Sequence, residues 1–161
     1  MKKRILSFVL CLVMLVSCLG FAPVVRAEKE TNTAGETNTT EIIVDNDEAV
    51  FVDSKWKSST YRKGYYGKDY CSIAQDTAED SKTASATWLP QIENSGYYNV
   101  YVQHPEGNGD SSISDSVPYT ITHASGETVV RLNQREKGKG GQWRRLGMFP
   151  FDAEKPSWRM R

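Results

Sequence analysis

The chain has 161 residues, with 20 lysines and arginines against 20 aspartates and glutamates, so its formal net charge is zero. Proteins that bind nucleic acid need a basic stripe to neutralise phosphates, and a balanced chain lacks the excess charge that supplies one. The composition therefore argues against nucleic acid as a partner. The length is sufficient for one hydrophobic core and leaves no room for a second domain.

The first 27 residues have the pattern of a signal peptide. Basic residues 2–4 precede an apolar stretch over 5–19, and Val25-Arg26-Ala27 forms a small-residue cleavage site. The apolar stretch is shorter than the roughly 20 residues that a membrane-spanning helix needs. We therefore expect cleavage after Ala27 and a secreted protein, extracellular or at the cell surface. Loss of residues 1–27 would leave 16 basic and 20 acidic residues, a mildly acidic chain.

A second way to process the same segment is open. Leu15-Val16-Ser17-Cys18 resembles a bacterial lipobox, in which the cysteine becomes a lipidated N-terminus. Lipidation at Cys18 would tether the protein to a membrane. Cys11 also lies in this segment, so cleavage after Ala27 would leave Cys71 as a single thiol that forms no internal disulfide. We interpret Cys71 as a small buried hydrophobic residue in a strand.

Residues 28–40 are expected to form a flexible spacer. They contain only Glu, Lys, Thr, Asn, Ala and Gly, with no large apolar side chain. Such a segment buries too little surface to offset the entropy that is lost when it becomes ordered. The spacer either holds the folded part away from a surface or is a disordered terminus without a role.

Residues 41–151 have the features of one all-β domain. Short apolar or alternating segments recur about every 8 to 12 residues, with turn residues between them, which is the spacing of a sandwich or barrel. The predicted strands are 41–44, 49–52, 70–74, 84–88, 97–103, 117–122, 128–133 and 142–149. No stretch has a long helical period with caps.

Alternation gives the strand over 97–103 an inner and an outer face. Tyr98, Val100 and Val102 share one face, while tyrosines and polar residues share the other. This pattern is typical of a sheet with one side on the core. Residues 106–112, which follow this strand, are rich in Gly, Ser and Asp and predict a surface loop.

The sequence has no motif of a reactive centre. Its two histidines, His104 and His123, lie in or beside predicted strands. There is no Gly-x-Ser-x-Gly or His-Glu-x-x-His motif, and the glycine-rich residues 138–141 form a loop between strands. Carboxylates are plentiful, but nothing singles out a glycosidase-like pair. We therefore predict a protein that is not an enzyme and has no cofactor.

Asp45 and Asp47 are the best candidates for metal ligands. They lie in Asp45-Asn46-Asp47-Glu48, and Ca²⁺ prefers the carboxylate and amide oxygens of such residues. The same side chains also stabilise turns by hydrogen bonding to nearby backbone groups. We favour the turn and keep a structural Ca²⁺ as the alternative.

Several motifs occur in the order seen in golvesin and xanthan lyase C-terminal domains. They are Ile43-Val44-Asp45-Asn46-Asp47, residues 64–70, Ala86-Thr87-Trp88, residues 96–102, residues 118–123, Val130 with Asn133-Gln134, and residues 141–151. The chain resembles this family over nearly its whole length after the signal peptide. The resemblance implies a galactose-binding-like jelly-roll β-sandwich. It also implies a noncatalytic module that recognises polysaccharide or cell-wall glycan.

The chain departs from the family pattern at two places. Arg145 stands where the family usually has an apolar residue, so that either the strand has a bulge there or Arg145 reaches an edge. Residues 152–161 have no alternating apolar pattern, whereas family members continue into one or two further strands. We therefore expect a truncated or frame-shifted sandwich that lacks its last strands, with an unpaired edge that invites pairing with another chain.

Four tyrosines are our candidate ligand-binding residues. Sugar rings stack on flat aromatic faces, while amide, carboxylate and guanidinium groups bind their hydroxyls. Tyr65 and Tyr66 lie beside glycines in a loop, and Tyr97 and Tyr101 share the outward face of one strand. We assign the remaining candidate rings to the core: Trp56, Tyr70, Trp88 and Trp143.

Three functions remain open at this stage. The first is a secreted, noncatalytic module that recognises extracellular polysaccharide or cell-wall glycan. The second is a structural or adhesive domain that docks proteins at the cell surface. The third is a fragment of a polysaccharide-degrading enzyme.

Overall fold

The described part of the protein consists of β-strands, one 3₁₀ helix and connecting loops. The computed structural model describes residues 12–13, 20–21, 24–33, 36–52, 55–73 and 84–153. Within these ranges no helix is long and apolar enough to cross a membrane. The predicted all-β class is confirmed. The strands are β1 (Leu12–Val13), β2 (Gly20–Phe21), β3 (Val24–Thr33), β4 (Glu36–Val44), β5 (Val50–Val52), β6 (Trp56–Ser59), β7 (Tyr70–Ile73), β8 (Ser85–Trp88), β9 (Gly96–Gln103), β10 (Val117–His123), β11 (Gly126–Leu132) and β12 (Arg144–Phe151), and the 3₁₀ helix η1 is Asn46–Glu48.

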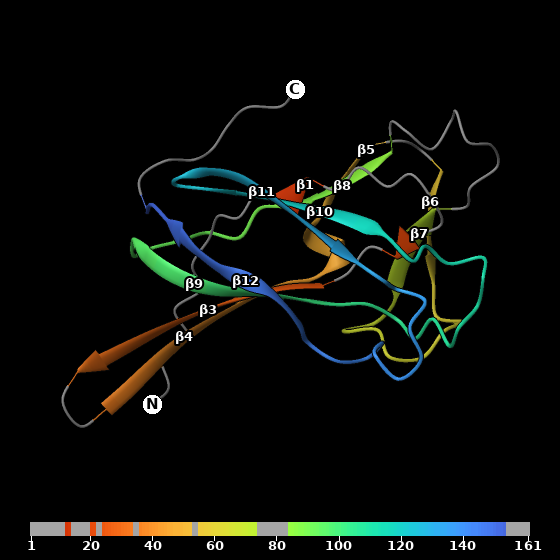
Figure 1. The fold of residues 1–161 in the computed structure, drawn as a ribbon, viewed down its shortest axis with the longest axis horizontal. Helices are drawn as coiled ribbons and strands as arrows, with labels where there is room; N and C mark the ends of the chain where they lie inside the picture. Colours follow the sequence, from red (N-terminus) through yellow and green to blue (C-terminus); the bar gives the residue numbers. More distant parts are fainter. Residues whose placement is uncertain are drawn as a thin grey trace.

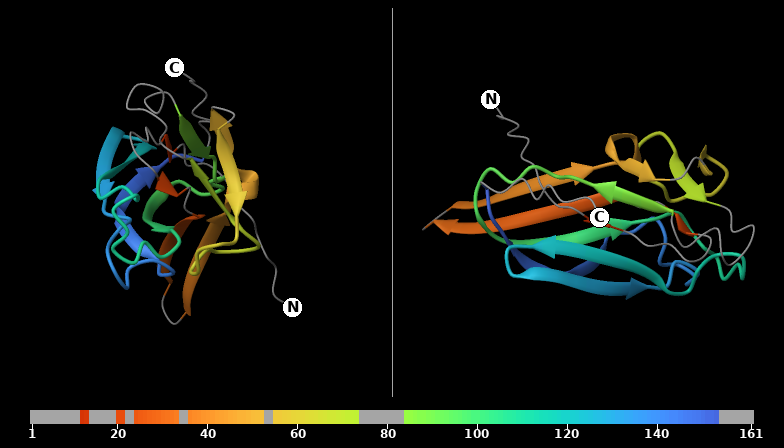
Figure 2. Two further views of the ribbon diagram at one scale, coloured as in Figure 1. Left: turned by 90° about the vertical axis from the view of Figure 1, so that its right-hand side faces the viewer. Right: turned by 90° about the horizontal axis from the view of Figure 1, so that it is seen from above.

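The strands form three antiparallel sheets. Their orders are β11-β10-β1-β8-β5, β12-β9-β3-β4 and β2-β7-β6. Figure 1 shows β8, β10 and β11 above β9, β12, β3 and β4, and Figure 2 shows the same arrangement from two further sides. This layering is consistent with the predicted β-sandwich. The jelly-roll connection order stays a prediction.

The main core lies between the four-stranded and five-stranded sheets. On β9, Tyr98, Val100 and Val102 are at most 1% exposed, as the alternation predicted. Trp88 of β8 and Ile121 of β10 belong to the same cluster and are fully buried. Burial of each large apolar side chain contributes about 1.5–3 kcal/mol, so this shared cluster holds the two sheets together.

A long hairpin occupies the region where the sequence predicted a cleavage site and a flexible spacer. β3 pairs with β4, and residues 24–28 of β3 also pair with β9. Figure 1 shows β3 and β4 projecting together from the body. The spacer prediction counted apolar residues and missed two features that favour a strand. One is pairing with a distant strand, and the other is the five β-branched threonines in 28–40.

A β-bulge accommodates Arg145 in β12. Arg145 pairs with Tyr101 of β9 and Gly147 pairs with Val100, so Leu146 is the extra residue. Leu146 is buried while Arg145 is exposed. The bulge was one of the two outcomes expected from the sequence, and it is confirmed. It keeps an apolar side chain in the core and places a guanidinium group on the outer face.

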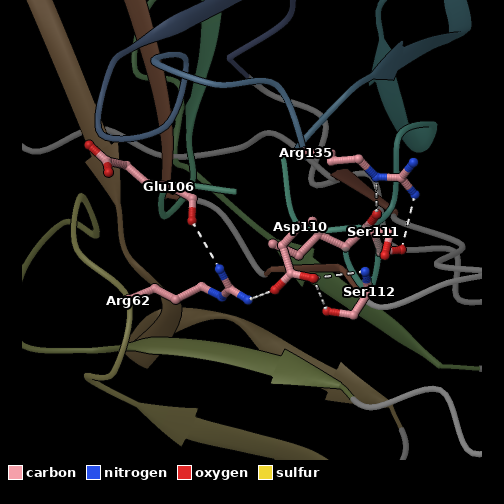
Figure 3. A network of polar contacts seen from close by, with 7 residues as sticks. Arg62, Glu106, Asp110, Ser111, Ser112 and Arg135 are labelled. Carbon is pink, nitrogen blue, oxygen red and sulfur yellow. Dashed lines mark hydrogen bonds and ion pairs between the residues drawn. The ribbon is translucent and has the colours of Figure 1, made fainter. Parts of the chain in front are cut away.

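Ion pairs and hydrogen bonds of arginine side chains hold the loops at one end of the sandwich in place (Figure 3). Arg62 forms an ion pair with Asp110 and lies 3.5 Å from the carbonyl oxygen of Glu106. Asp110 also accepts hydrogen bonds from the backbone N–H and the hydroxyl of Ser112, at 2.9 and 2.7 Å. These two bonds, with the Arg62 contact after them, lower the pKa of Asp110 to about 2. Arg135 donates to two backbone carbonyls of the same loop.

Two glycines let neighbouring loops touch. A Cβ atom on Gly140 would lie 2.4 Å from the Cα of Glu106, and one on Gly107 would lie 2.1 Å from the carbonyl oxygen of Gln134. Both distances are far shorter than packed atoms allow, so glycine alone fits at these positions. These backbone contacts close the loop end of the molecule.

Replacement of Gly140 by alanine is expected to lower the free energy of unfolding by about 3 kcal/mol, because the new methyl group overlaps backbone atoms. Gly138→Ala is the control, since Gly138 has φ +70 and a methyl group there would meet nothing within 4 Å. That variant isolates the left-handed backbone cost of about 1 kcal/mol. Urea titration followed by tryptophan fluorescence measures both. Equal midpoints for the two variants would contradict the close loop contact.

His104 is a fully buried polar side chain at the end of β9. Its Nδ1 lies 2.8 Å from the carbonyl oxygen of Pro105, so Nδ1–H donates and Nε2 carries the lone pair. Nε2 is buried and has no hydrogen-bond partner among the described residues. Burial lowers the pKa of His104 from its ordinary 6.5, and the charge of Arg144 acts in the same direction. The imidazole is therefore neutral in the folded protein at neutral pH.

Stability is expected to decrease as the pH falls below 6.5, the ordinary pKa of histidine. Below this pH His104 takes up a proton in the unfolded chain but not in the folded protein. The free energy of unfolding therefore decreases until the pH passes the lowered pKa of His104 in the folded protein. Urea midpoints measured from about pH 8 to about pH 5 test this. His104→Gln removes this part of the pH dependence, and His123→Gln is the control. An unchanged pH profile in His104→Gln would disprove the assignment.

Candidate functional site

Aromatic and charged side chains gather on the outward side of the four-stranded sheet. Tyr101 points outward because its neighbours on β9 are buried in the core. Arg26 of β3 pairs directly with Tyr101 across the two strands. Tyr66 comes from the loop between β6 and β7, and Trp143 immediately precedes β12. We call these four residues the aromatic face: Arg26, Tyr66, Tyr101 and Trp143.

Arg26 is the centre of the aromatic face. Its Cζ lies 5.6 Å from the ring centroid of Tyr101 and 5.6 Å from that of Trp143. The rings of Trp143 and Tyr66 are 5.8 Å apart and inclined by 53°. A cation over an aromatic ring contributes about 0.5–1 kcal/mol at a partly exposed position. One guanidinium group and three rings therefore form a connected surface.

Two carboxylates compensate the charge of Arg26. Glu28 forms an ion pair with it along the same strand, and Glu41 of β4 approaches from the neighbouring strand. Arg26 Nε lies 2.8 Å from Glu41 Oε1 but without the alignment of a hydrogen bond. The Arg26 side chain keeps 23% of its surface exposed. One guanidinium and two carboxylates leave this end of the aromatic face polar, with one formal negative charge in excess.

Arg145 extends the polar part of this surface on the other side of Tyr101. It pairs with Tyr101 across β12 and β9, and its Nε donates a 2.9 Å hydrogen bond to Oδ1 of Asn99. Tyr101 is therefore flanked by a guanidinium group on each neighbouring strand. Amide and guanidinium groups beside a ring are suited to hydrogen bonding with a polar ligand that lies on the ring.

The structure brings two of the four predicted tyrosines together. Tyr66 and Tyr101 both belong to the aromatic face and are connected through Trp143 and Arg26. Tyr65 instead packs against buried Tyr70, with ring centroids 5.9 Å apart. Tyr97 is outward and 62% exposed, but it lies four residues along β9 from Tyr101, which is about 13 Å.

Sequence reasoning missed Trp143 and Arg26. It assigned Trp143 to the core, whereas the structure places this ring half-buried on the outer face beside Tyr66. It assigned Arg26 to a segment that is removed. The polar and glycine residues around Trp143 were a signal of a surface position. By contrast, Trp88 is fully buried as predicted, and Trp56 packs partly buried against Phe51 at 5.1 Å.

Asp45 and Asp47 take structural roles in a turn. Asp45 precedes η1, and its Oδ1 accepts a 2.8 Å hydrogen bond from the backbone N–H of Asn46. Burial, with neighbouring carboxylates, raises the pKa of Asp45. Asp47 pairs with Lys68 at 3.7 Å. No three metal-ligating side chains come together in the ranges that the structure describes. These contacts match the turn interpretation that the sequence favoured.

The candidate lipidation residue Cys18 lies outside the described residues. Cys71 of β7 is partly buried and packs against the main core. Burial is the main cause that raises the pKa of its thiol, and the charge of Asp69 adds to the effect. Cys71 therefore stays protonated at neutral pH, in keeping with a hydrophobic packing role.

The comparisons with known proteins agree with the order of the sequence motifs. The model of the Golvesin C-terminal domain matches residues 42–157. This range begins in β4 and includes β5 to β12, while β1, β2 and β3 lie before it. Neither the curated proteins nor the solved structures gave a match. Because the family model covers well over half of the sequence, the chain belongs to the golvesin C-terminal domain family.

Proposed function

We propose that the protein is a secreted, noncatalytic module that binds extracellular polysaccharide or cell-wall glycan through its aromatic face. Membership of the golvesin family fits a secreted domain of cell-surface proteins. The observation that carries the proposal is the connected group of three rings and one guanidinium on the outward side of the sheet.

The aromatic face suits the two-sided chemistry of a sugar ring. A pyranose has an apolar C–H side, which stacks on rings such as those of Tyr101 and Trp143, and a rim of hydroxyls. The amide of Asn99 and the guanidinium of Arg145 lie beside Tyr101 and supply hydrogen-bonding groups for that rim. Because Tyr101 and Arg145 are on paired strands, little conformational freedom is lost when a ligand binds.

The positions of the histidines and of the nearby carboxylates support a noncatalytic role. His104 is buried with its Nδ1 bonded to Pro105. His123 bonds to Thr128 at 3.0 Å and stacks on Phe149, with ring centroids 5.2 Å apart. The carboxylates that adjoin the aromatic face pair with Arg26. These groups therefore act as parts of the framework.

A protein-docking role is the second candidate. Val50 and Val52 are 50% and 53% exposed, and they lie on β5, which ends the order of the five-stranded sheet. An exposed apolar end strand is a surface on which another polypeptide adds a strand. This surface is separate from the aromatic face, so the two candidates are distinguished by variants at different positions.

Tyr101→Ala and Trp143→Ala are each expected to weaken retention on insoluble cell-wall polysaccharide about tenfold, since each removes one stacking ring. Retention is measured by sedimentation of the protein with the polysaccharide at increasing concentration. The matched control is Tyr61→Ala, which removes a ring that is 87% exposed and not part of the aromatic face.

Equal retention of all three variants would show that the glycan site lies outside the aromatic face. Absence of binding to any polysaccharide tested, together with protein capture that Val50→Lys abolishes, would favour the docking role instead.

A further inference from the structure

The strand β3 occupies a central position in the four-stranded sheet. It lies between β9 and β4, with Val25 opposite Val102 on one side and Val44 on the other. Val25 and Ala27 are 0% and 1% exposed and belong to the main core cluster. β3 precedes the part of the chain that the family model matches. The matched residues alone therefore do not supply the strand between β9 and β4.

Cleavage after Ala27, as the signal-peptide pattern suggests, would remove most of the contact between β3 and β9. Five residue pairs form that contact, from Val24 opposite Gln103 to Glu28 opposite Asn99. Cleavage at Ala27 would leave only the last pair. The described ladders of β4 are with β3, so Glu28 would be the one residue of β3 that still joins β4 to β9. Backbone groups and apolar side chains of β9 would then face an open slot in the sheet.

Cleavage at the same bond would also remove Arg26 from the outer face. Arg26 contacts Tyr101 and Trp143 and pairs with Glu28 and Glu41. Both sides of the sheet therefore use residues that precede the Ala27–Glu28 bond. Inside are two buried apolar side chains, and outside is the cation at the centre of the aromatic face.

We infer that Val24–Glu28 is a permanent strand of the folded protein, and that the exported chain is processed at a bond before Val24 and not after Ala27. The occupant of the slot between β9 and β4 is this segment of the chain itself. The lipobox-like sequence Leu15-Val16-Ser17-Cys18 offers an earlier bond. Cleavage before its cysteine keeps every residue of β3 and removes the two-residue strand β1, which makes two residue pairs with β10 and two with β8. This inference concerns maturation and is independent of the proposed ligand.

The first test determines the N-terminus of the exported protein. The full chain with a C-terminal affinity tag is produced in an exporting bacterium, and the exported product is analysed by N-terminal sequencing and intact mass. We expect a product whose first residue is Val24 or an earlier one. A first residue at Val25 or later, such as Glu28, overturns the inference.

The second test follows stability in the exported protein. Val25→Ala keeps a small residue in the cleavage pattern, so it preserves the signal for cleavage after Ala27. If Val24–Glu28 is retained, loss of two buried methyl groups lowers the urea midpoint by roughly 1 M. Val129→Ala is the control, because Val129 on β11 is 57% exposed, and its midpoint stays that of the unaltered protein. An unchanged midpoint in Val25→Ala shows that the residue has been removed and overturns the inference.

Discussion

The pairing of β3 with both β9 and β4 is the interaction on which the rest of the structure depends. It places Val25 and Ala27 in the core and continues one hydrogen-bonded sheet from β12 to β4. β4 in turn carries Ile42 and Val44, which are also buried in the main cluster. Backbone groups in the middle of a sheet need partners on both sides, because an unpaired buried N–H or C=O costs free energy.

The core and the aromatic face result from the same alternation. Successive residues of a strand point to opposite sides, so the residues that flank Tyr101 on β9 fill the core while Tyr101 faces outward. A shift of one residue in the pairing of β3 would exchange these roles and put Arg26 inside. The bulge at Leu146 corrects the alternation of β12 at the one place where the sequence conflicts with it. Fold and candidate site therefore depend on a single register.

The sequence predicted well those features that depend on one strand at a time. The stripe of Tyr98, Val100 and Val102 and the bulge near Arg145 follow from local patterns of apolar and polar residues. The β3–β4 hairpin was not predicted from local patterns, because its stability comes from the pairing of β3 with β9, which is more than 60 residues away in the chain.

The candidate site was also predictable only where it depends on the pattern of a single strand. Tyr101 was assigned outward from the pattern of its own strand, and the structure agrees. The orientations of Tyr65 and Trp143 depend on neighbours from other segments. Tyr65 packs against the buried side chains of Tyr70 and Ile113. Trp143 instead contacts Tyr66 and Arg26 on the outer face. No local pattern contains these partners.

The root and the tip of the β3–β4 hairpin differ in the number of neighbouring strands that pair with them. Near the root, residues 24–28 have a partner strand on each side, but the pairs from Lys29 to Thr33 have only β4 beside them. A two-stranded ribbon by itself is marginally stable in water. Amide hydrogens are therefore expected to exchange with solvent faster toward the tip. Local opening then begins at the projecting end and stops at Glu28, where the pairing of β3 with β9 begins.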